Sequence, residues 1–205
     1  MIRVVDYGVG NIQAFLNLFD RLGLNAERAS EPSDLTDATH LILPGVGHFD
    51  HAMRSFNKSG LRRPVEELVL NQNKPLLGVC VGMQMLAHSS EEGLLPGLGW
   101  IPGSVHSFER KLESETLPLP HMGWNDLKIN TPSIMFPKTE VVSPQFYFLH
   151  SYYFSATNRS DVIATTNYGL DFDAVVCHKN VYGMQCHPEK SHSWGEQFLR
   201  AFTEL

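Results

Sequence analysis

Three apolar runs in the first half of the chain each lead into a turn that contains glycine, and residues at helical spacing follow each turn. Such runs are typical of buried strands, and the amphipathic stretches after them are typical of covering helices. Strands are expected at 2–6, 25–28, 40–44 and 75–79, and helices at 12–22, 51–57, 63–71 and 82–87. The alternation predicts an α/β fold with a mostly parallel central sheet and flanking helices.

The second half has shorter β-rich stretches joined by turns, at 104–108, 147–154, 161–168, 174–179 and 181–187. Their close spacing predicts antiparallel strands added to the sheet as hairpins. An amphipathic helix at 193–203 is expected to bury Trp194, Phe198 and Phe202, and residues 109–120 are expected to be the most mobile segment. The chain has 205 residues, 42% of them hydrophobic, without a linker or repeat, so one domain over residues 1–205 is expected.

Charge and cysteine content exclude several classes of protein. The net charge is −6 and basic residues are scattered, which does not favour binding to nucleic acid or to an anionic membrane. The N-terminal apolar run is too short for a signal peptide, and no run approaches the length of a membrane span. Three widely spaced cysteines favour neither a disulfide framework nor a zinc site, which predicts a reducing, cytoplasmic location.

A cysteine lies between two glycines at the expected junction of strand 75–79 and helix 82–87. The sequence Gly78-Val79-Cys80-Val81-Gly82 has the form of a nucleophile elbow, in which the chain turns so sharply that side chains on either side would clash. The amide of Val81, after the nucleophile, is expected to point to where an oxyanion forms. The alternative is a small buried cysteine that serves only in packing.

A thiol nucleophile needs a base and a group that holds the base. His187 follows the β-rich stretch 181–187, and Glu189 comes two residues later, beyond Pro188. The extended backbone around a proline allows both side chains to project to one side. Glu189 is then expected to orient the imidazole of His187 and to stabilise its protonated form. The alternative is an ordinary surface turn.

The turn Pro44-Gly45-Val46-Gly47 follows the buried strand at 40–44. Ligands of parallel sheets bind beyond the carboxyl ends of the strands, so this turn and Cys80 are expected to lie together. Glycines allow backbone amides to approach a substrate carbonyl, although the same letters also suit a simple tight turn.

Together, the motifs PGVG, LLGVCVGMQML with SSEEG, PHMGWN, YFLHSYY and GMQCHPEKS resemble the class I, triad-type glutamine amidotransferases. Within that family the chain is similar to the glutaminase subunits of imidazole glycerol phosphate synthases. The resemblance extends from DYGVGN to the last helix, nearly the whole chain. It implies hydrolysis of glutamine to glutamate and ammonia, by Cys80 as nucleophile, His187 as base and Glu189 as its orienting acid.

The resemblance also implies how the substrate is held. Oxyanion stabilisation would come from the Val81 amide and the loop of Gly45, Val46 and Gly47. The residues that would bind glutamine are Gln84, Glu92, His150, Ser151 and Tyr152. Gln84 is four residues after Cys80 and so shares its helix face, and a carboxylate such as Glu92 suits the substrate's ammonium group.

The family's glutaminase subunits dock on a (β/α)₈-barrel cyclase, which receives ammonia through a tunnel and completes imidazole glycerol phosphate in histidine biosynthesis. The resemblance implies a heterodimer of this kind, no cofactor and no metal. It places Asn11, Met122, Trp124 and Lys190 at or near the interface. Met122 and Trp124 belong to the motif PHMGWN, which is expected to form a loop. The alternative for Trp124 is a core position. Two departures from the common family pattern are Cys186, which replaces an aromatic residue, and Val81, which replaces leucine.

Several other functions stay open at this point. A paralogous glutaminase supplies ammonia to an amidotransferase acting on an acetamido sugar of surface polysaccharide, and it would have the same three catalytic residues. An autonomous cysteine hydrolase, such as a γ-glutamyl peptidase, would act without a partner. A non-enzymatic elbow-cysteine protein would tolerate loss of Cys80.

Two further sites are disfavoured by the residues themselves. Gly8-Val9-Gly10 suggests a dinucleotide-binding turn, but Gln13 stands where the third glycine or alanine is required. The pairs Cys177-His178 and Cys186-His187 could suggest a metal site, but adjacent residues on a strand point to opposite faces and chelate poorly.

Overall fold

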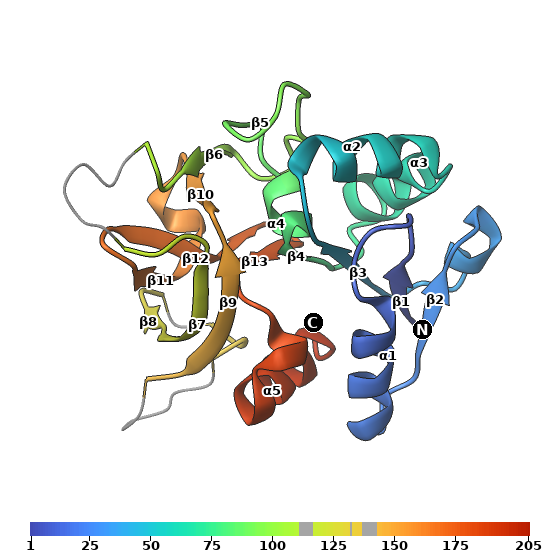
Figure 1. Ribbon diagram of the computed structural model, residues 1–205. Helices are drawn as coiled ribbons and strands as arrows, with labels where there is room; N and C mark the ends of the chain where they lie inside the picture. Colours follow the sequence, from blue (N-terminus) through green and yellow to red (C-terminus); the bar gives the residue numbers. More distant parts are fainter. Residues whose placement is uncertain (111–116, 132, 137–142) are drawn as a thin grey trace.

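The computed structural model describes residues 1–110, 117–131, 133–136 and 143–205. Its main feature is an eight-stranded sheet in the order β2-β1-β3-β4-β13-β12-β11-β8 (Figure 1). These strands are β1 (Ile2–Val5), β2 (Ala26–Ala29), β3 (His40–Gly45), β4 (Leu76–Cys80), β8 (Lys128–Ile129), β11 (Val162–Asn167), β12 (Asp171–His178) and β13 (Val181–Met184).

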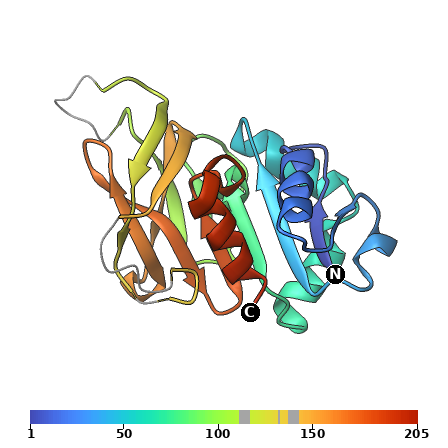
Figure 2. The same ribbon diagram turned by 90° about the horizontal axis from the view of Figure 1, so that it is seen from below.

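Helices cover both faces of this sheet (Figure 1). They are α1 (Ile12–Arg21), α2 (Phe49–Lys58), α3 (Arg62–Glu66), α4 (Val81–Met85) and α5 (His192–Phe202), with short helical turns η1 (Pro32–Leu35), η2 (Glu67–Asn71), η3 (Arg159–Asp161) and η4 (Pro188–Lys190). Helices α1 and α5 lie on one face, in front of the sheet when it is seen from below, and α2, α3 and α4 lie on the other (Figure 2).

The first five strands in the sheet order, from β2 to β13, are mutually parallel. In β1, β3, β4 and β13 the side chains are almost all buried because helices cover both faces, which explains the apolar runs of the sequence there. The edge strand β2 differs, since Glu27 and Arg28 are exposed. The predicted α/β class with a mostly parallel sheet is confirmed. The helix expected at 63–71 is present but changes character, since α3 continues as the π-helical turn η2.

Strands β12, β11 and β8 extend the sheet in antiparallel fashion. The other strands of the second half form separate small sheets, β10-β6-β5 and β7-β9. Their bounds are β5 (Ser89–Ser90), β6 (Gly103–Ser107), β7 (His121–Asp126), β9 (Gln145–His150) and β10 (Tyr152–Ala156).

Two sequence predictions for this half are wrong. The stretch 147–154 is not one strand, because the chain leaves β9 at Ser151 and enters a different sheet as β10. Strand β13 was expected only as part of an added antiparallel hairpin. It pairs with β12 in that way, but it also pairs in parallel with β4 and so belongs to the central sheet. The expected mobile segment 109–120 lies partly outside the described residues, which exclude 111–116.

The C-terminal helix buries most of the residues that its periodicity predicts. Phe198 and Phe202 are fully buried, but Trp194 is only partly buried against the core. Trp194 is on the buried side of α5, but it lies in the first turn of the helix, which begins at His192. The prediction for Trp194 was therefore only partly right.

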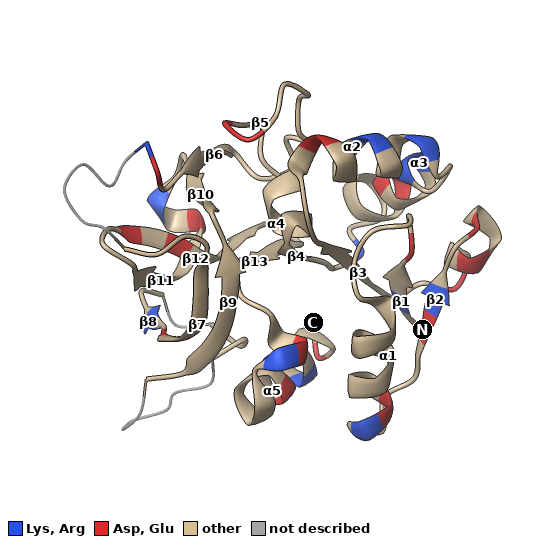
Figure 3. Ribbon diagram, viewed as in Figure 1, with Lys and Arg blue, Asp and Glu red and all other residues tan. Residues whose placement is uncertain are grey.

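Acidic and basic side chains are mixed along the elements rather than separated. Figure 3 shows both signs on α2 and α3, and both on β2 and the adjoining η1. This distribution does not favour an anionic macromolecule as a partner. Within the described ranges, no helix combines the length and the apolar character needed to cross a membrane.

Candidate active site

Cys80 occupies a sharp turn between β4 and α4. Its backbone has φ 55° and ψ −114°, a conformation that residues other than glycine rarely adopt. A Cβ atom on Gly78 would meet the carbonyl oxygen of Gly82 at 2.7 Å, and one on Gly82 would collide with the carbonyl oxygen of Leu43. The two glycines are therefore a steric requirement of the turn, as the elbow pattern predicts.

The turn after β3 lies beside this elbow. Gly45 and Cys80 are paired at the carboxyl ends of the parallel strands β3 and β4. A Cβ atom on Gly45 would collide with the backbone nitrogen of Gly82, so only glycine permits this close approach. Val46 is 43% exposed and Gly47 has φ 79°, which leaves the loop at the surface of the site.

The segment with His187 reaches the same edge because β13 is parallel to β4, with Met184 paired to Val79. Nδ1 of His187 lies 2.8 Å from Oε1 of Glu189, and both side chains are almost fully buried. Burial would lower the pKa of His187, but the neighbouring Cys80 and Glu189 groups outweigh it and raise the pKa to about 10. The site therefore favours a positively charged imidazole beside the sulfur.

A cavity of about 370 Å³ opens beside the sulfur of Cys80. A space of this size suits a small molecule such as an amino acid. The cavity is lined by Val46, Gly47, Cys80, Val81, Gln84, Glu92, Pro120, Leu149, His150, Ser151, Tyr152, His187 and Lys190. It thus brings together every residue predicted to bind substrate, whereas Gly45 and Glu189 do not form part of the lining.

Gln84 is buried on the first turns of α4, with a fixed side-chain amide. Its Nε2 atom donates to the carbonyl oxygen of Tyr152 at 3.0 Å and to Oε1 of Gln185 at 3.1 Å. Since both N–H groups are used within the protein, the amide oxygen is the atom that Gln84 can offer to a ligand.

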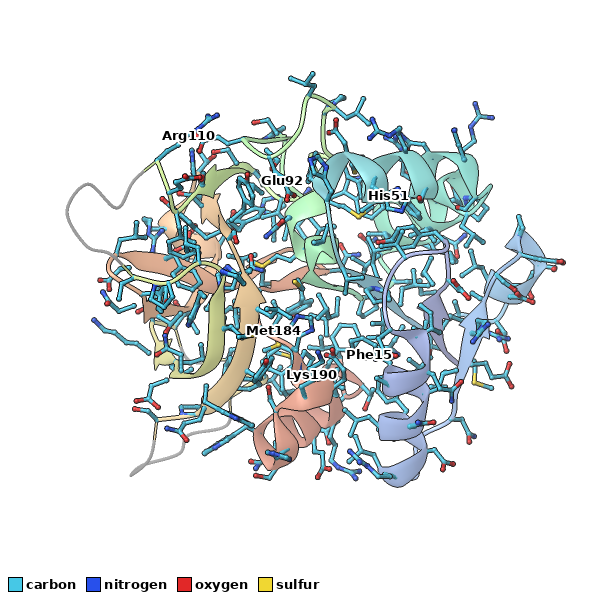
Figure 4. All side chains as sticks on the ribbon, viewed as in Figure 1. Phe15, His51, Glu92, Arg110, Met184 and Lys190 are labelled. Atoms are coloured by element: carbon cyan, nitrogen blue, oxygen red, sulfur yellow. The ribbon has the colours of Figure 1, made fainter. Side chains whose placement is uncertain are left out.

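Glu92 lies beside the first turn of α2, as Figure 4 shows. Its Oε2 accepts a 2.7 Å hydrogen bond from the backbone N–H of Phe49. Burial raises the pKa of Glu92, and this hydrogen bond opposes the shift. Asp50 accepts in turn from the backbone N–H groups of Leu94 and Leu95, so the two segments hold each other in place. Glu92 is thus a positioned carboxylate at the cavity wall.

The residues predicted for a partner interface are all exposed. Met122 and Trp124, which are 65% and 47% exposed, lie on one face of β7 because they alternate along it. The expectation of a loop at PHMGWN is wrong, since β7 pairs with β9 from His121 to Asp126. Lys190 lies 5.6 Å from the ring centre of Tyr147, and Asn11 caps the N-terminus of α1.

Comparison with known proteins places the chain. The family model for glutamine amidotransferase class-I matches residues 3–204. The chain belongs to the class-I glutamine amidotransferase family. Among its relatives, proteins named imidazole glycerol phosphate synthase subunit HisH from Bdellovibrio bacteriovorus and Leptospira borgpetersenii are 51% and 43% identical, each over 100% of both chains. One named subunit HisH 2, from Pseudomonas aeruginosa, is 45% identical over 100% of both chains.

Solved structures share the amidotransferase fold at lower identity. One, titled as a crystal structure of glutamine amidotransferase, has a TM-score of 0.74 and 21% identity, covering 99% of this chain and 97% of the other. A glutamine amidotransferase from Thermotoga maritima has a TM-score of 0.62 and 16% identity, covering 99% of this chain and 82% of the other. These similarities support the fold of the amidotransferase domain.

Two amidotransferase residues next to the predicted set were missed. Gln185 is fully buried, and its Nε2 atom lies 3.8 Å from the sulfur of Cys80. His121 is buried and its Nδ1 lies 3.0 Å from Nε2 of His150. The spacing of two residues between Gln185 and His187 could have indicated the former, because alternate residues of an extended segment share a face. No local signal indicates the pairing of His121.

The metal alternative gains no support. Cys186 is fully buried, and the thiol of Cys177 lies 3.3 Å from the carbonyl oxygen of Lys179. In the part of the chain that the structure describes, no group of three or more His, Cys, Asp or Glu side chains is arranged to hold a metal ion.

Proposed function

We propose that this chain is the glutamine-hydrolysing subunit of an imidazole glycerol phosphate synthase, acting in histidine biosynthesis. The observation that carries the proposal is the meeting, at one cavity, of an elbow cysteine with a buried His187–Glu189 pair that is distant in sequence. Full-length relatives at up to 51% identity carry the name of that synthase subunit, which favours this acceptor over an acetamido sugar. The predicted cytoplasmic location stays a prediction.

In the proposed reaction, the proton of the Cys80 thiol moves to His187, and the sulfur attacks the side-chain carbonyl carbon of glutamine. The carbon–nitrogen bond of the tetrahedral intermediate then breaks, and the imidazolium of His187 gives its proton to the leaving ammonia. Water, deprotonated by His187, hydrolyses the thioester and releases glutamate. Glu189 holds the imidazole in one orientation and stabilises its positive charge.

The cavity wall supplies groups for each part of glutamine. The Glu92 carboxylate suits the α-ammonium group, and the amide oxygen of Gln84 is free to accept a hydrogen bond. His150, Ser151 and Tyr152 also line the cavity. We assign stabilisation of the oxyanion to the amide of Val81 and to the loop 45–47, which adjoin the sulfur.

We propose further that ammonia passes to a (β/α)₈-barrel cyclase bound over this cavity. The support is the exposed apolar face of β7, made by Met122 and Trp124, which borders strand β9 and the cavity residue Leu149. Exposed aromatic side chains of this kind are frequent anchors of protein interfaces. Lys190 and Asn11 complete the proposed contact surface.

Ammonia release from glutamine by the purified chain, with and without the cyclase and its ligand, tests the function. Low activity alone and strong stimulation by the cyclase are expected, with loss of both in Cys80→Ser. High activity without a partner, and cleavage of γ-glutamyl peptides, would instead identify an autonomous hydrolase. Full activity of Cys80→Ser would exclude the mechanism.

A further inference from the structure

Gln185 lies directly after β13, and its side chain reaches the sulfur of Cys80 without lining the cavity. It is fully buried, and its Nε2 atom is 3.8 Å from the sulfur of Cys80. Its Oε1 atom is 3.1 Å from Nε2 of Gln84. The side-chain amide of Gln185 has an oxygen, which accepts hydrogen bonds, and an NH₂ group, which donates them. Its hydrogen-bond neighbours determine which of the two faces the sulfur.

The carbonyl oxygen of Tyr152 determines the orientation of both amides, because a carbonyl oxygen can only accept hydrogen bonds. Gln84 lies 3.0 Å from this oxygen and must therefore present its NH₂ group there. The second N–H of the same group points to Gln185, which must present its oxygen in return. The NH₂ group of Gln185 is left facing the sulfur of Cys80 as a donor. Reversing either amide would set like groups against each other.

The same carbonyl oxygen is also a hydrogen-bond neighbour of His150, which is paired with His121. Nδ1 of His150 lies 2.8 Å from the Tyr152 oxygen and donates to it, so Nε2 of His150 accepts from Nδ1 of His121 at 3.0 Å. Nε2 of His121 then accepts from Asn125 at 3.3 Å. Burial lowers the pKa of His121 to about 4 and that of His150 to about 3, which agrees with one proton on each ring.

Besides His187, the described residues include hydrogen-bond neighbours of opposite kind at the sulfur of Cys80. The thiol donates to the carbonyl oxygen of Leu149 at 3.9 Å, and the amide of Gln185 donates to the sulfur. When the thiol loses its proton the first bond is lost, whereas the second becomes a bond to an anion and gains strength.

We propose that Gln185 is a catalytic residue that donates an N–H to the thiolate of Cys80. The thiol proton moves to His187, no other bond changes, and the negative sulfur is held between the imidazolium and the Gln185 amide. Gln84 acts through Gln185 as a positioning residue. This inference deepens the proposed function, since it assigns the nucleophile a second partner, but it concerns a step that needs no glutamine.

The test is the rate at which iodoacetamide alkylates Cys80 between pH 6 and pH 10, followed by mass spectrometry of the Cys80 peptide. Gln185→Leu removes the donor, and Gln185→Glu keeps an oxygen for Gln84 while placing a carboxylate against the sulfur. For both variants we expect the rate at pH 7, relative to the rate at pH 10, to fall about tenfold. An unchanged profile in two folded variants would overturn the proposal.

Asn180→Leu is the matched control. Asn180 lies at the opposite end of the same strand, where its side chain donates two 2.8 Å hydrogen bonds to the carbonyl oxygens of Val69 and Lys74. This variant should lose stability and keep the wild-type alkylation profile. A shifted profile in Asn180→Leu would mean that general loosening of β13, rather than the Gln185 donor, controls the sulfur. Because alkylation requires no substrate, a wild-type chain that fails to hydrolyse glutamine would leave this test intact.

Discussion

The imidazole of His187 is held by one oxygen of the Glu189 carboxylate, at 2.8 Å, while the other oxygen, Oε2, is buried without a hydrogen-bond partner among the described residues. A buried carboxylate with so few partners depends on the charge next to it. His187 therefore supplies most of the compensation for Glu189, and Glu189 in turn helps to keep the imidazole protonated.

Glu189→Gln should lower kcat for glutamine hydrolysis about 100-fold, because the neutral amide stabilises the imidazolium far less. KM for glutamine should change little, since Glu189 does not line the cavity. Glu91→Gln is the matched control: Glu91 also lies beside a histidine, His106, at 3.3 Å, but outside the cavity. Steady-state kinetics of both variants check the prediction, which is wrong if they lose activity equally.

Cys80→Ala and Cys80→Gly should both abolish glutamine hydrolysis, since neither retains the sulfur. They should differ in stability, because φ of 55° with ψ of −114° is costly for any residue with a Cβ atom. Cys80→Gly is expected to be more stable than Cys80→Ala by about 1 kcal/mol. Urea denaturation measures the difference, and a more stable alanine variant would show that the elbow is unstrained.

The buried histidine pair predicts loss of stability in mild acid. Burial lowers the pKa of His121 to about 4 and that of His150 to about 3, below the ordinary value of 6.5. Between pH 6.5 and pH 4 the unfolded chain binds more protons than the folded chain. The free energy of unfolding should therefore fall with falling pH, by about 1.4 kcal/mol per pH unit for each of these histidines.

His121→Phe tests this slope, because phenylalanine can keep the stacking on Phe148 and Tyr168, whose ring centres lie 4.8 Å and 4.0 Å away. Its unfolding free energy, measured in urea at pH 6.5, 5.5 and 4.5, should depend less steeply on pH than that of the wild type. Parallel slopes for the two proteins would count against neutral, buried histidines at this position.

Trp124→Ala should retain the basal hydrolysis of glutamine and lose at least tenfold in affinity for the cyclase, since exposed aromatic anchors often contribute 2 kcal/mol or more, roughly, to an interface. Leu70→Ala is the matched control, as Leu70 is similarly exposed (48% against 47%) but lies on η2, before the amino end of β4. Isothermal titration calorimetry, with each variant titrated against the cyclase, compares the two dissociation constants. Equal affinities for the two variants would remove β7 from the interface.

Sequence reasoning located the elbow and the glycine-lined turn because both depend on local steric rules. There is no room for a Cβ atom at Gly45, Gly78 or Gly82. A requirement for glycine can be recognised directly in the sequence. The parallel sheet was also predictable, since strands buried on both faces must be continuously apolar.

The parts that sequence reasoning missed depend on contacts between distant segments. The β-rich stretch 147–154 has no glycine or proline to mark the change of sheet at Ser151, because the change is imposed by the partners β7 and β6. In the same way, His121 meets His150 only through the pairing of β7 with β9. Gln185 was not predicted because its proposed role depends on the orientation of its amide. That orientation is determined by Tyr152 on β10, through the hydrogen bonds of Gln84.

Strand β13 occupies the place between β4 and β12, although it is the last in sequence of the strands in the described residues. It covers an edge of β4, and the segment after it brings Gln185 and His187 beside the cysteine. A chain that stops before Val181 therefore lacks the side chains that the folded protein places beside the Cys80 sulfur, as well as the strand that covers the edge of β4.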